Sequence, residues 1–288
     1  MTEKQSQLVR VLAFSKKVSF VAATVCAVTL LLSVPTSAQE GANLDDIQRQ
    51  RSDSADAENG TNPTKLTTQM GLQYSYNKIN PSLNNGLLEF FYQRPIGDGS
   101  KALKVTVPFA DNPNLRQNLN LFEENAVGDV SLTFLNVFHL TQKAGAAYTA
   151  ELFLNTASNG AGYGQMALET SLFYAMFLDN GAIFAPAWVQ TFGLEGGNSA
   201  GKKLNTTTLD FYYVPKLPNR KLFMTFDPAI VHDWESSDTF GSLQVTFGML
   251  TGKLFGGDSQ VFIKPGVGIG KDAPFDWSFE VGFKVLNF

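Results

Sequence analysis

Apolar and polar residues alternate with a period of two along most of the chain from residue 66 to residue 288. Residues 275–285, for example, read FDWSFEVGFKV, in which every odd-numbered residue is apolar and every even-numbered residue is polar, charged or glycine. Successive side chains of a β-strand point to opposite faces, so such a strand has one apolar and one polar face. No long stretch keeps the 3.6-residue apolar spacing of an amphipathic helix. The alternation therefore predicts an all-β structure for residues 66–288.

This region divides into twelve runs, each followed by turn-forming or loop-forming residues. A strand tilted across a bilayer needs about 9–11 residues, and each run supplies at least nine. Tight connections, such as residues 97–99, alternate with longer ones, of which residues 111–126 form the longest. Short turns at one rim and long loops at the other are typical of a transmembrane β-barrel. The predicted strands are 66–78, 86–95, 102–110, 127–140, 145–155, 165–178, 181–192, 204–214, 220–232, 239–250, 257–268 and 275–288.

The composition of the polar face distinguishes a membrane barrel from a soluble β-sandwich or a lipocalin-like barrel, which would also alternate. A soluble protein would carry many lysines and glutamates on that face. Here Ser, Thr, Gln, Asn and Gly dominate, and charged residues make up only 17 % of the chain, against about 25 % in soluble domains. Aromatic residues amount to 12 % and gather at the ends of runs, as at Tyr212, Trp234 and Trp277. Membrane barrels carry such aromatic girdles at both interfaces.

We therefore predict one antiparallel transmembrane β-barrel of about twelve strands in the outer membrane of a Gram-negative bacterium, in contact with outer-membrane lipid. An even strand number predicts that both termini lie on the periplasmic side. The chain ends in Phe288, predicted to be part of the last strand. This ending resembles the signal that the outer-membrane assembly machinery reads, so we expect that machinery to be a partner. The alternation slips by one residue at Val285 and Leu286, which makes the signal imperfect.

The first 38 residues have the three parts of a cleaved secretory signal peptide. Residues 1–17 carry four basic residues and one acidic residue, residues 18–34 are apolar, and Ala38 ends a stretch of small residues suited to signal peptidase. A membrane-anchor helix is the alternative, but this apolar run is short for a span. The only cysteine, Cys26, lies inside the apolar run, so cleavage after Ala38 leaves a chain without cysteine.

Residues 39–65 contain several acidic residues and almost no large apolar side chain. Such a segment buries too little apolar surface to offset the entropy that ordering costs. We predict a disordered periplasmic segment, with a short plug folded back into a pore as the alternative. The predicted organisation is a signal peptide at 1–38, the disordered segment at 39–65 and the outer-membrane barrel at 66–288.

The small number of metal-binding and basic residues excludes several function classes. The chain has one Cys, two His and a formal net charge of −4. One cysteine builds neither a disulfide scaffold nor a cysteine-ligated zinc site, and two histidines make a His-rich metal site a poor fit. A net negative charge argues against nucleic-acid binding. We therefore predict no cofactor, no metal and no nucleic-acid partner.

If the apolar positions face lipid, the alternate positions face the lumen. Two interpretations of the charged residues on that phase are open: a polar conduit with a slight cation preference, or a salt-bridged set of side chains that fills the barrel. Twelve strands enclose more room than the roughly eight that side chains just fill, and less than the roughly sixteen of open porins. The predicted pore-lining residues are Glu89, Gln93, Lys104, Glu151, Glu169, Asp210, Asp227, Lys264, Glu280 and Lys284. Aromatic residues on the same phase, which either line a solute path or fill space, are Phe91, Phe153, Phe173 and Tyr212.

Signals of catalysis are weak. Some outer-membrane barrels are lipases, which need a serine and a histidine within hydrogen-bond reach. His139 lies on the lumen phase near the end of its run, and His232 lies at a rim. The glycine-rich residues 266–270 precede no predicted helix, so they are better explained as small residues in a barrel strand than as a phosphate-binding loop. We predict that the protein is not an enzyme.

Short motifs along residues 66–288 resemble those of the outer-membrane barrels assigned to meta-pathway phenol degradation, many of which are called transporters or neuromedin U-like. The motifs are Val-Gly-Asp-Val-Ser-Leu at 127–132, Asp-Trp-Glu at 233–235, Gly-Gly at 256–257 and Pro-Phe-Asp-Trp-Ser-Phe at 274–279. Two positions depart from that family: Asn155, where it often has Pro, and Met166, where Trp is expected. The resemblance implies a barrel of this size and the passage of small, often hydrophobic molecules.

From these features we expect an outer-membrane channel or transporter that passes small hydrophobic or aromatic solutes through a polar lumen. The first alternative is a non-conducting structural or surface-interaction barrel, with the long loop at 111–126 as its candidate surface. The second is a lipid-modifying enzyme that depends on His232 or His139.

Overall fold

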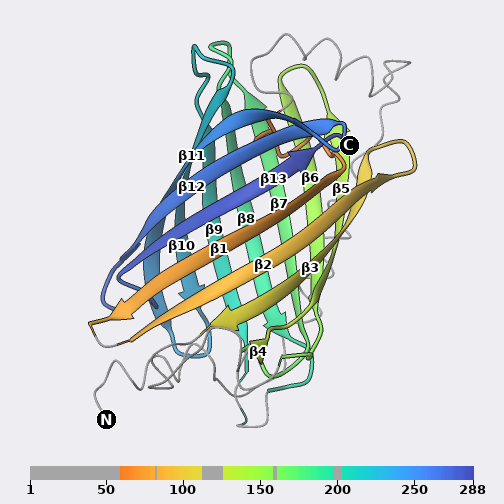
Figure 1. Ribbon diagram of the computed structural model, residues 1–288. Helices are drawn as coiled ribbons and strands as arrows, with labels where there is room; N and C mark the ends of the chain where they lie inside the picture. Colours follow the sequence, from red (N-terminus) through yellow and green to blue (C-terminus); the bar gives the residue numbers. More distant parts are fainter. Residues whose placement is uncertain (1–58, 82, 112–125, 158–160, 198–200, 202) are drawn as a thin grey trace.

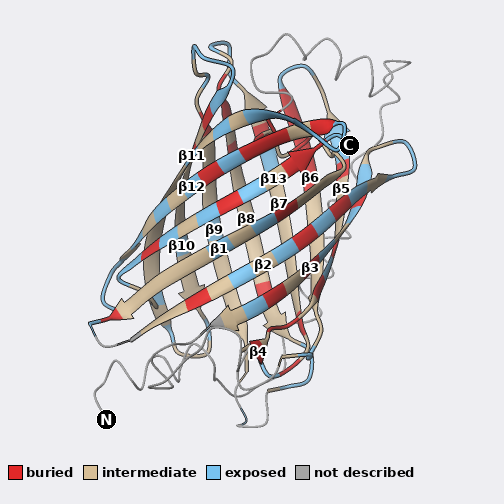
Figure 2. Cartoon of the chain, viewed as in Figure 1, coloured by how far each residue is buried: buried red, intermediate tan, exposed pale blue. Residues whose placement is uncertain are grey.

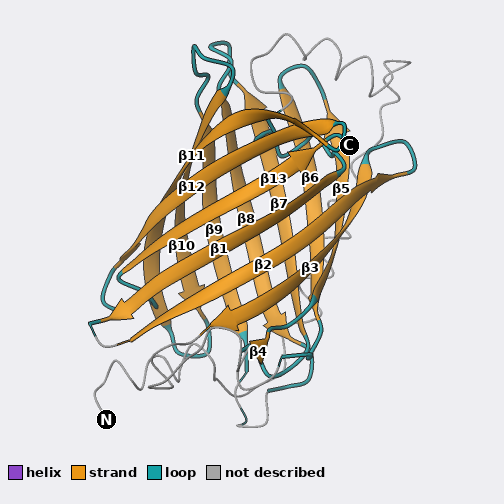
Figure 3. Cartoon of the chain, viewed as in Figure 1, coloured by secondary structure: helices purple, strands orange, loops and turns teal. Residues whose placement is uncertain are grey.

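A computed structural model of the protein describes residues 59–81, 83–111, 126–157, 161–197, 201 and 203–288. The predicted signal peptide, residues 39–58 and most of the long loop at 111–126 lie outside the described residues. Every helix or strand that the structure assigns in the described ranges is a β-strand (Figure 3). Helices long and apolar enough to cross a membrane do not occur in these ranges.

The strands form one sheet that closes on itself (Figure 1). All strand pairs are antiparallel, and the ring closes where β1 pairs with β13, from Gln69 opposite Leu286 to Lys78 opposite Trp277. The two-residue strand β4 pairs with the end of β3, and the other twelve strands make the closed ring, which confirms the predicted twelve-stranded barrel. The strands are β1 (Gln69–Asn80), β2 (Leu83–Ile96), β3 (Lys101–Asp111), β4 (Ala126–Val127), β5 (Ser131–Leu140), β6 (Ala144–Phe153), β7 (Ala167–Phe177), β8 (Ile183–Gly193), β9 (Asn205–Val214), β10 (Leu222–Asp233), β11 (Asp238–Leu254), β12 (Gly257–Ile269) and β13 (Trp277–Leu286).

The single strand predicted at 127–140 is divided into β4 and β5 in the structure. The amide of Gly128 donates a hydrogen bond to the carbonyl of Pro108, at 2.8 Å. The next residue, Asp129, is buried and accepts hydrogen bonds from the connection between β6 and β7. A Cβ atom at Gly128 would overlap the ring of Pro108, so this break in the ladder requires glycine. The Gly-Asp pair therefore ends β4 and anchors a loop.

The outer face of the barrel is apolar. Alternate positions carry large exposed hydrophobic side chains, among them Leu103, 51 % exposed, and Phe247, 46 % exposed. Figure 2 shows the resulting alternation of exposed and less exposed positions along β2, β12 and β13. Because a closed sheet pairs its backbone polar groups internally, it can cross a bilayer. A closed antiparallel barrel with this exterior is a bacterial outer-membrane barrel.

The two rims of the barrel differ in their connections. The tight-turn rim carries the connections after β2, β5, β7, β9 and β11, together with the start of β1 and the end of β13. The long-loop rim carries the remaining connections, including the longest. Inside the tight-turn rim, a buried apolar cluster consists of Ala175, Ile183, Ala185 and Val214, with Phe177 and Tyr212 packed against it.

Three phenylalanine side chains of the inner wall each place the end of the ring over a glycine of the neighbouring strand. Phe91 covers Gly71, and in the same way Phe223 and Phe262 cover Gly248 and Gly282; a Cβ atom at any of these glycines would overlap the ring. All three rings are 6 % exposed. These positions need glycine for space rather than for backbone freedom, and the rings make part of the inner wall apolar.

Two local predictions were wrong. A register shift between Val137 and His139 moves His139 from the lumen phase to the outer phase, where it is exposed opposite Ala146. A bulge of this kind adds one residue and exchanges the faces beyond it. At the C-terminus, β13 ends at Leu286, because Asn287 has a left-handed backbone conformation with φ of 57°. Phe288 therefore lies beyond the last strand, with its ring 6.4 Å from that of Tyr92.

Candidate functional site

The ten residues predicted to line the pore all lie on the inward phase of their strands. Lys104 and Glu280, for example, each alternate with exposed apolar neighbours on both sides. The ladder also pairs inward residues with each other across strands, as in Gln93 with Lys104 and Lys264 with Glu280. Sequence alternation was therefore sufficient to place these side chains on one face. Passage of a solute along them stays a prediction.

Four of the six carboxylates lie in one sector of the wall, from β6 to β10, which we call the acidic sector: Glu151, Glu169, Asp210 and Asp227. Glu151 and Glu169 face each other directly across β6 and β7. Ser131 donates a hydrogen bond to Glu151 at 2.5 Å, and Thr191 donates one to Glu169 at 2.8 Å. Carboxylates this close together disfavour each other's ionised form, and a nearby cation relieves that repulsion.

Asp227 in β10 joins the acidic sector to the lysines on the other side of β11. The ammonium of Lys264 in β12 lies 4.0 Å from a carboxylate oxygen of Asp227. Both side chains remain 24 % exposed, so packed side chains do not enclose this ion pair completely.

The opposite sector, from β12 through β13 and β1 to β3, contains two lysines that lie against aromatic rings. The ammonium of Lys284 lies 4.8 Å from the ring centre of Phe262 and 5.6 Å from that of Phe91. The ammonium of Lys104 lies 5.7 Å from the ring centre of Phe91. Such cation–π contacts stabilise a lysine without neutralising its charge. We call this group the lysine–phenylalanine site, defined by Lys104, Lys284, Phe91 and Phe262.

The carboxylates of this second sector have hydrogen-bond donors of their own. Glu89 accepts a hydrogen bond from the side-chain amide of Gln73 at 2.8 Å, and Glu280 accepts one from Ser75 at 2.9 Å. Each donor comes from β1, one strand away from its acceptor. These bonds fix both carboxylates on the inner wall.

Residues 59–68, which we call the mouth segment, contact strands on different sides of the tight-turn rim. Tyr212 in β9 donates a hydrogen bond to the carbonyl of Thr61 at 3.2 Å, and Gln93 in β2 donates one to the carbonyl of Thr67 at 3.1 Å. Thr64 packs against Gly145 in β6. Because these strands are spread around the ring, the segment extends across the opening, where it appears close to the C-terminus in Figure 1.

The mouth segment is held in shape by two local turns that repeat. The side-chain oxygen of Asn59 accepts hydrogen bonds from the backbone and the hydroxyl of Thr61, and Asn62 does the same for Thr64. Asn59, Thr61 and Thr64 are buried. Sequence reasoning assigned residues 59–65 to a disordered segment with a plug as the alternative. The signal for order was the repeated Asn-x-Thr spacing, since such side chains form local turns with their own backbone.

At the long-loop rim, Asp129 organises the connection between β6 and β7. Its carboxylate accepts backbone hydrogen bonds from Ala157 at 3.0 Å and Tyr163 at 2.6 Å. The ring of Tyr163 packs edge-on against Phe153, with centroids 5.2 Å apart. Burial raises the pKa of the Tyr163 phenol, and the nearby carboxylates of Glu169, Glu151 and Asp129 raise it further. The connection therefore brings a neutral phenol close to the acidic sector.

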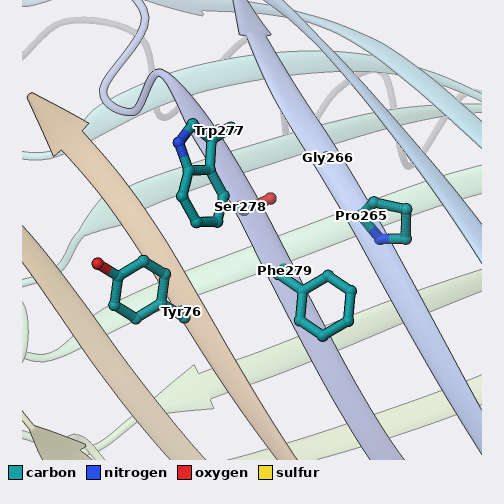
Figure 4. A pocket seen from close by; sticks show the side chains of 6 residues that line it. All are labelled: Tyr76, Pro265, Gly266, Trp277, Ser278 and Phe279. Carbon is teal, nitrogen blue, oxygen red and sulfur yellow. The ribbon is translucent and has the colours of Figure 1, made fainter.

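A separate hollow of about 490 Å³ lies on the outer face of β1, β12 and β13. Tyr76, Trp277, Phe279 and Pro265 line it, and Figure 4 shows their side chains around Gly266 and Ser278. The rings of Tyr76 and Trp277 are 5.4 Å apart. Since it opens on the lipid-facing surface, this hollow is not part of the lumen.

The two histidines do not form a catalytic arrangement with each other. His139 lies on the outer face in the bulge of β5. The Nδ1 atom of His232 lies 2.8 Å from the hydroxyl of Thr239, and its ring packs edge-on against Trp234. Among the residues that the structure describes, no group of three His, Cys, Asp or Glu side chains is arranged to hold a metal ion.

Comparison with known proteins gives matches in structure only. No protein-family model and no curated protein matches the chain. An outer membrane channel from Pseudomonas putida F1 is similar with a TM-score of 0.57 at 11 % identity, over 78 % of this chain and 98 % of that one. KdgM porin is similar with a TM-score of 0.50 at 10 % identity, over 75 % of this chain and 98 % of that one. At such low identity, these likenesses show that the fold is that of an outer-membrane barrel.

Proposed function

We propose that this protein is an outer-membrane channel that passes small hydrophobic or aromatic solutes through its polar lumen. The observation that carries the proposal is the solvent-accessible ion pair of Lys264 and Asp227 inside a closed barrel. Ionic groups in a lumen filled by side chains would be sealed from water, which is costly. The fold shared with an outer membrane channel and a porin supports the same conclusion.

In this proposal the tight-turn rim faces the periplasm, as short turns do in outer-membrane barrels. The mouth segment then closes the periplasmic opening, and solute passes when the segment leaves its contacts with Tyr212 and Gln93. Its interactions support this role, because the hydrogen bonds from Tyr212 and Gln93, at 3.2 and 3.1 Å, each use one side chain of the wall. The assembly machinery would read the C-terminal end, where Phe288 is exposed.

The solute class rests on two supports. Rings of Phe91 and Phe262 form part of the inner wall beside charged side chains, which suits a solute that has an apolar part. The motifs at 127–132 and 274–279 resemble those of barrels assigned to phenol degradation, which favours aromatic solutes. We also propose that the barrel itself is not catalytic, since His139 and His232 lie on separate strands and neither faces the acidic sector.

A non-conducting barrel is the second candidate, and a specific observation favours it. Phe91, Phe223 and Phe262 are each only 6 % exposed, and the mouth segment crosses one opening. A barrel closed in this way could instead present its long loops to a partner. Conductance separates the two candidates.

The test is the conductance of the refolded predicted mature chain, residues 39–288, in a planar bilayer, compared with that of a truncated chain without residues 39–65. We expect discrete open levels and a larger current after the truncation, because the truncation removes Thr61 and Thr64 from the opening. Heat-modifiable migration on a gel confirms that each sample is a folded barrel. The absence of any current from a folded, truncated chain would overturn the channel proposal in favour of the non-conducting barrel.

A further inference from the structure

Lys284 lies on the inward phase of β13 and makes no ion pair with a carboxylate of the described residues. It stands opposite Gln260 in β12 and Gly71 in β1. Among the described residues, Lys284 contacts the rings of Phe262 and Phe91 and makes no ion pair. In contrast, Lys264 on the adjacent strand forms an ion pair with Asp227. Lys104 likewise contacts a ring and makes no ion pair with the described residues. Two ammonium groups therefore share one ring, that of Phe91, and both remain available to an anion.

Buried polar side chains around these lysines have unused hydrogen-bonding atoms. Thr106, opposite Phe91, is 8 % exposed, and Thr133, opposite Lys104, is 5 % exposed; neither hydroxyl has a hydrogen-bond partner within the described residues. Buried polar groups without partners are costly, so two such hydroxyls beside the lysines indicate a ligand that accepts hydrogen bonds.

The acidic sector restricts the charge that such a ligand carries. The four carboxylates of β6 to β10 repel an anion from their side of the lumen and favour its approach to the lysines. Glu280 lies on the same face of β13 as Lys284 and Glu89 lies on β2, but they accept hydrogen bonds from Ser75 and Gln73. The lysine–phenylalanine site is therefore the part of the wall best suited to a negative group.

We infer that the lysine–phenylalanine site binds organic monoanions with an apolar body, with aromatic carboxylates as the representative class. The carboxylate would accept charge-assisted hydrogen bonds from Lys284 and Lys104 and one from the hydroxyl of Thr106. The apolar body would lie along the rings of Phe91 and Phe262. This inference deepens the proposed function, because it names the solute class of the same lumen.

The test is equilibrium binding of benzoate to the refolded mature chain in detergent micelles, measured by isothermal titration calorimetry. Benzyl alcohol and benzylammonium have the same ring without the negative charge. We expect saturable benzoate binding at least about tenfold tighter than that of either analogue, which is the usual worth of a charge-assisted contact. Equal binding of benzoate and benzyl alcohol would overturn the inference.

Matched lysine substitutions locate the site. Lys284→Met should weaken benzoate binding about tenfold, and Lys284→Arg should largely restore it. Lys264→Met is the control, since that lysine lies in the same lumen but is paired with Asp227; it should change benzoate binding less than about threefold. Lys104→Met provides the same test if Lys284→Met does not refold. Unchanged binding in Lys284→Met, or in Lys104→Met where that variant replaces it, would overturn the inference.

Failure of this inference is distinguishable from failure of the proposed function. A folded chain that binds benzoate but never conducts contradicts the channel and supports the site. A chain that conducts but binds benzoate no better than benzyl alcohol supports the channel and removes the site.

Discussion

The outer and inner faces of this barrel come from the same strands but follow different rules. On the outer face, a side chain such as Phe247 needs only lipid and is exposed without a specific partner. On the inner face, polar side chains find partners on other strands, as Ser75 does with Glu280, 205 residues away. A substitution on the outer face therefore acts through its polarity and depth. A substitution on the inner face acts through the loss of a particular partner or the loss of space.

The largest expected difference between the faces comes from an introduced charge. Phe247→Arg should destabilise the barrel by about 2–4 kcal/mol if the residue lies near the bilayer midplane, because the guanidinium would face lipid. Gln244→Arg on the same strand should cost much less, since that side chain faces the lumen. Denaturant unfolding in lipid vesicles measures both. Equal penalties would show that the two faces have been assigned to the wrong phases.

An added methyl group, unlike an added charge, should destabilise the barrel more on the inner face than on the outer face. Gly248→Ala places a methyl group against the ring of Phe223 and should cost about 1–3 kcal/mol, as overpacking does. Gly241→Ala, on the outer face of the same strand, meets its nearest atoms at 3.5 Å and should cost less than about 0.5 kcal/mol. The same unfolding measurement applies. A larger cost at Gly241 would contradict the close packing of the inner wall.

Two adjacent tyrosines, one on each face, allow the effect of removing one hydroxyl group to be compared. Tyr212→Phe removes the hydrogen bond to the mouth segment and should cost about 1 kcal/mol. It should also increase the current through the barrel, because the segment is held less firmly. Tyr213→Phe is the control on the outer face, where the ring lies 6.2 Å from that of Phe226. Identical currents in the two variants would argue against closure by the mouth segment.

The smallest effect should come from the exposed rim of the outer face. Trp234→Phe removes the indole donor to Thr207, a bond of 2.8 Å at a side chain that is 58 % exposed. Water replaces that partner, so the change in unfolding free energy should stay within about 0.5 kcal/mol. A loss comparable to that in Tyr212→Phe would mean that this rim has a structural role of its own.

The sequence was sufficient for everything that depends on alternation. The twelve strands and the phase of residues such as Glu89 and Lys284 follow from a period of two, because one face must be apolar in lipid. It was not sufficient where one inserted residue exchanges the inner and outer faces of a strand, as in the bulge before His139. A bulge leaves no clear composition signal in β5.

Contacts that depend on the register between strands also could not be predicted from the sequence. The Phe91 ring over Gly71 and the lysines against it require knowing which residues of β1, β2 and β13 stand opposite each other. The mouth segment was missed for a related reason. Its order depends on contacts with Tyr212, Gln93 and Gly145, which only the closed barrel brings to one opening.

The most direct test of the account is to tether the mouth segment by a disulfide in a chain that begins at residue 39, which otherwise lacks cysteine. A Cβ atom built on Gly145 lies 3.3 Å from the Cβ of Thr64, close to the roughly 3.5–4.5 Å that a disulfide spans. The Thr64→Cys/Gly145→Cys variant should show little current when oxidised and discrete openings after reduction. The same current in both states would contradict a channel that opens when the mouth segment leaves.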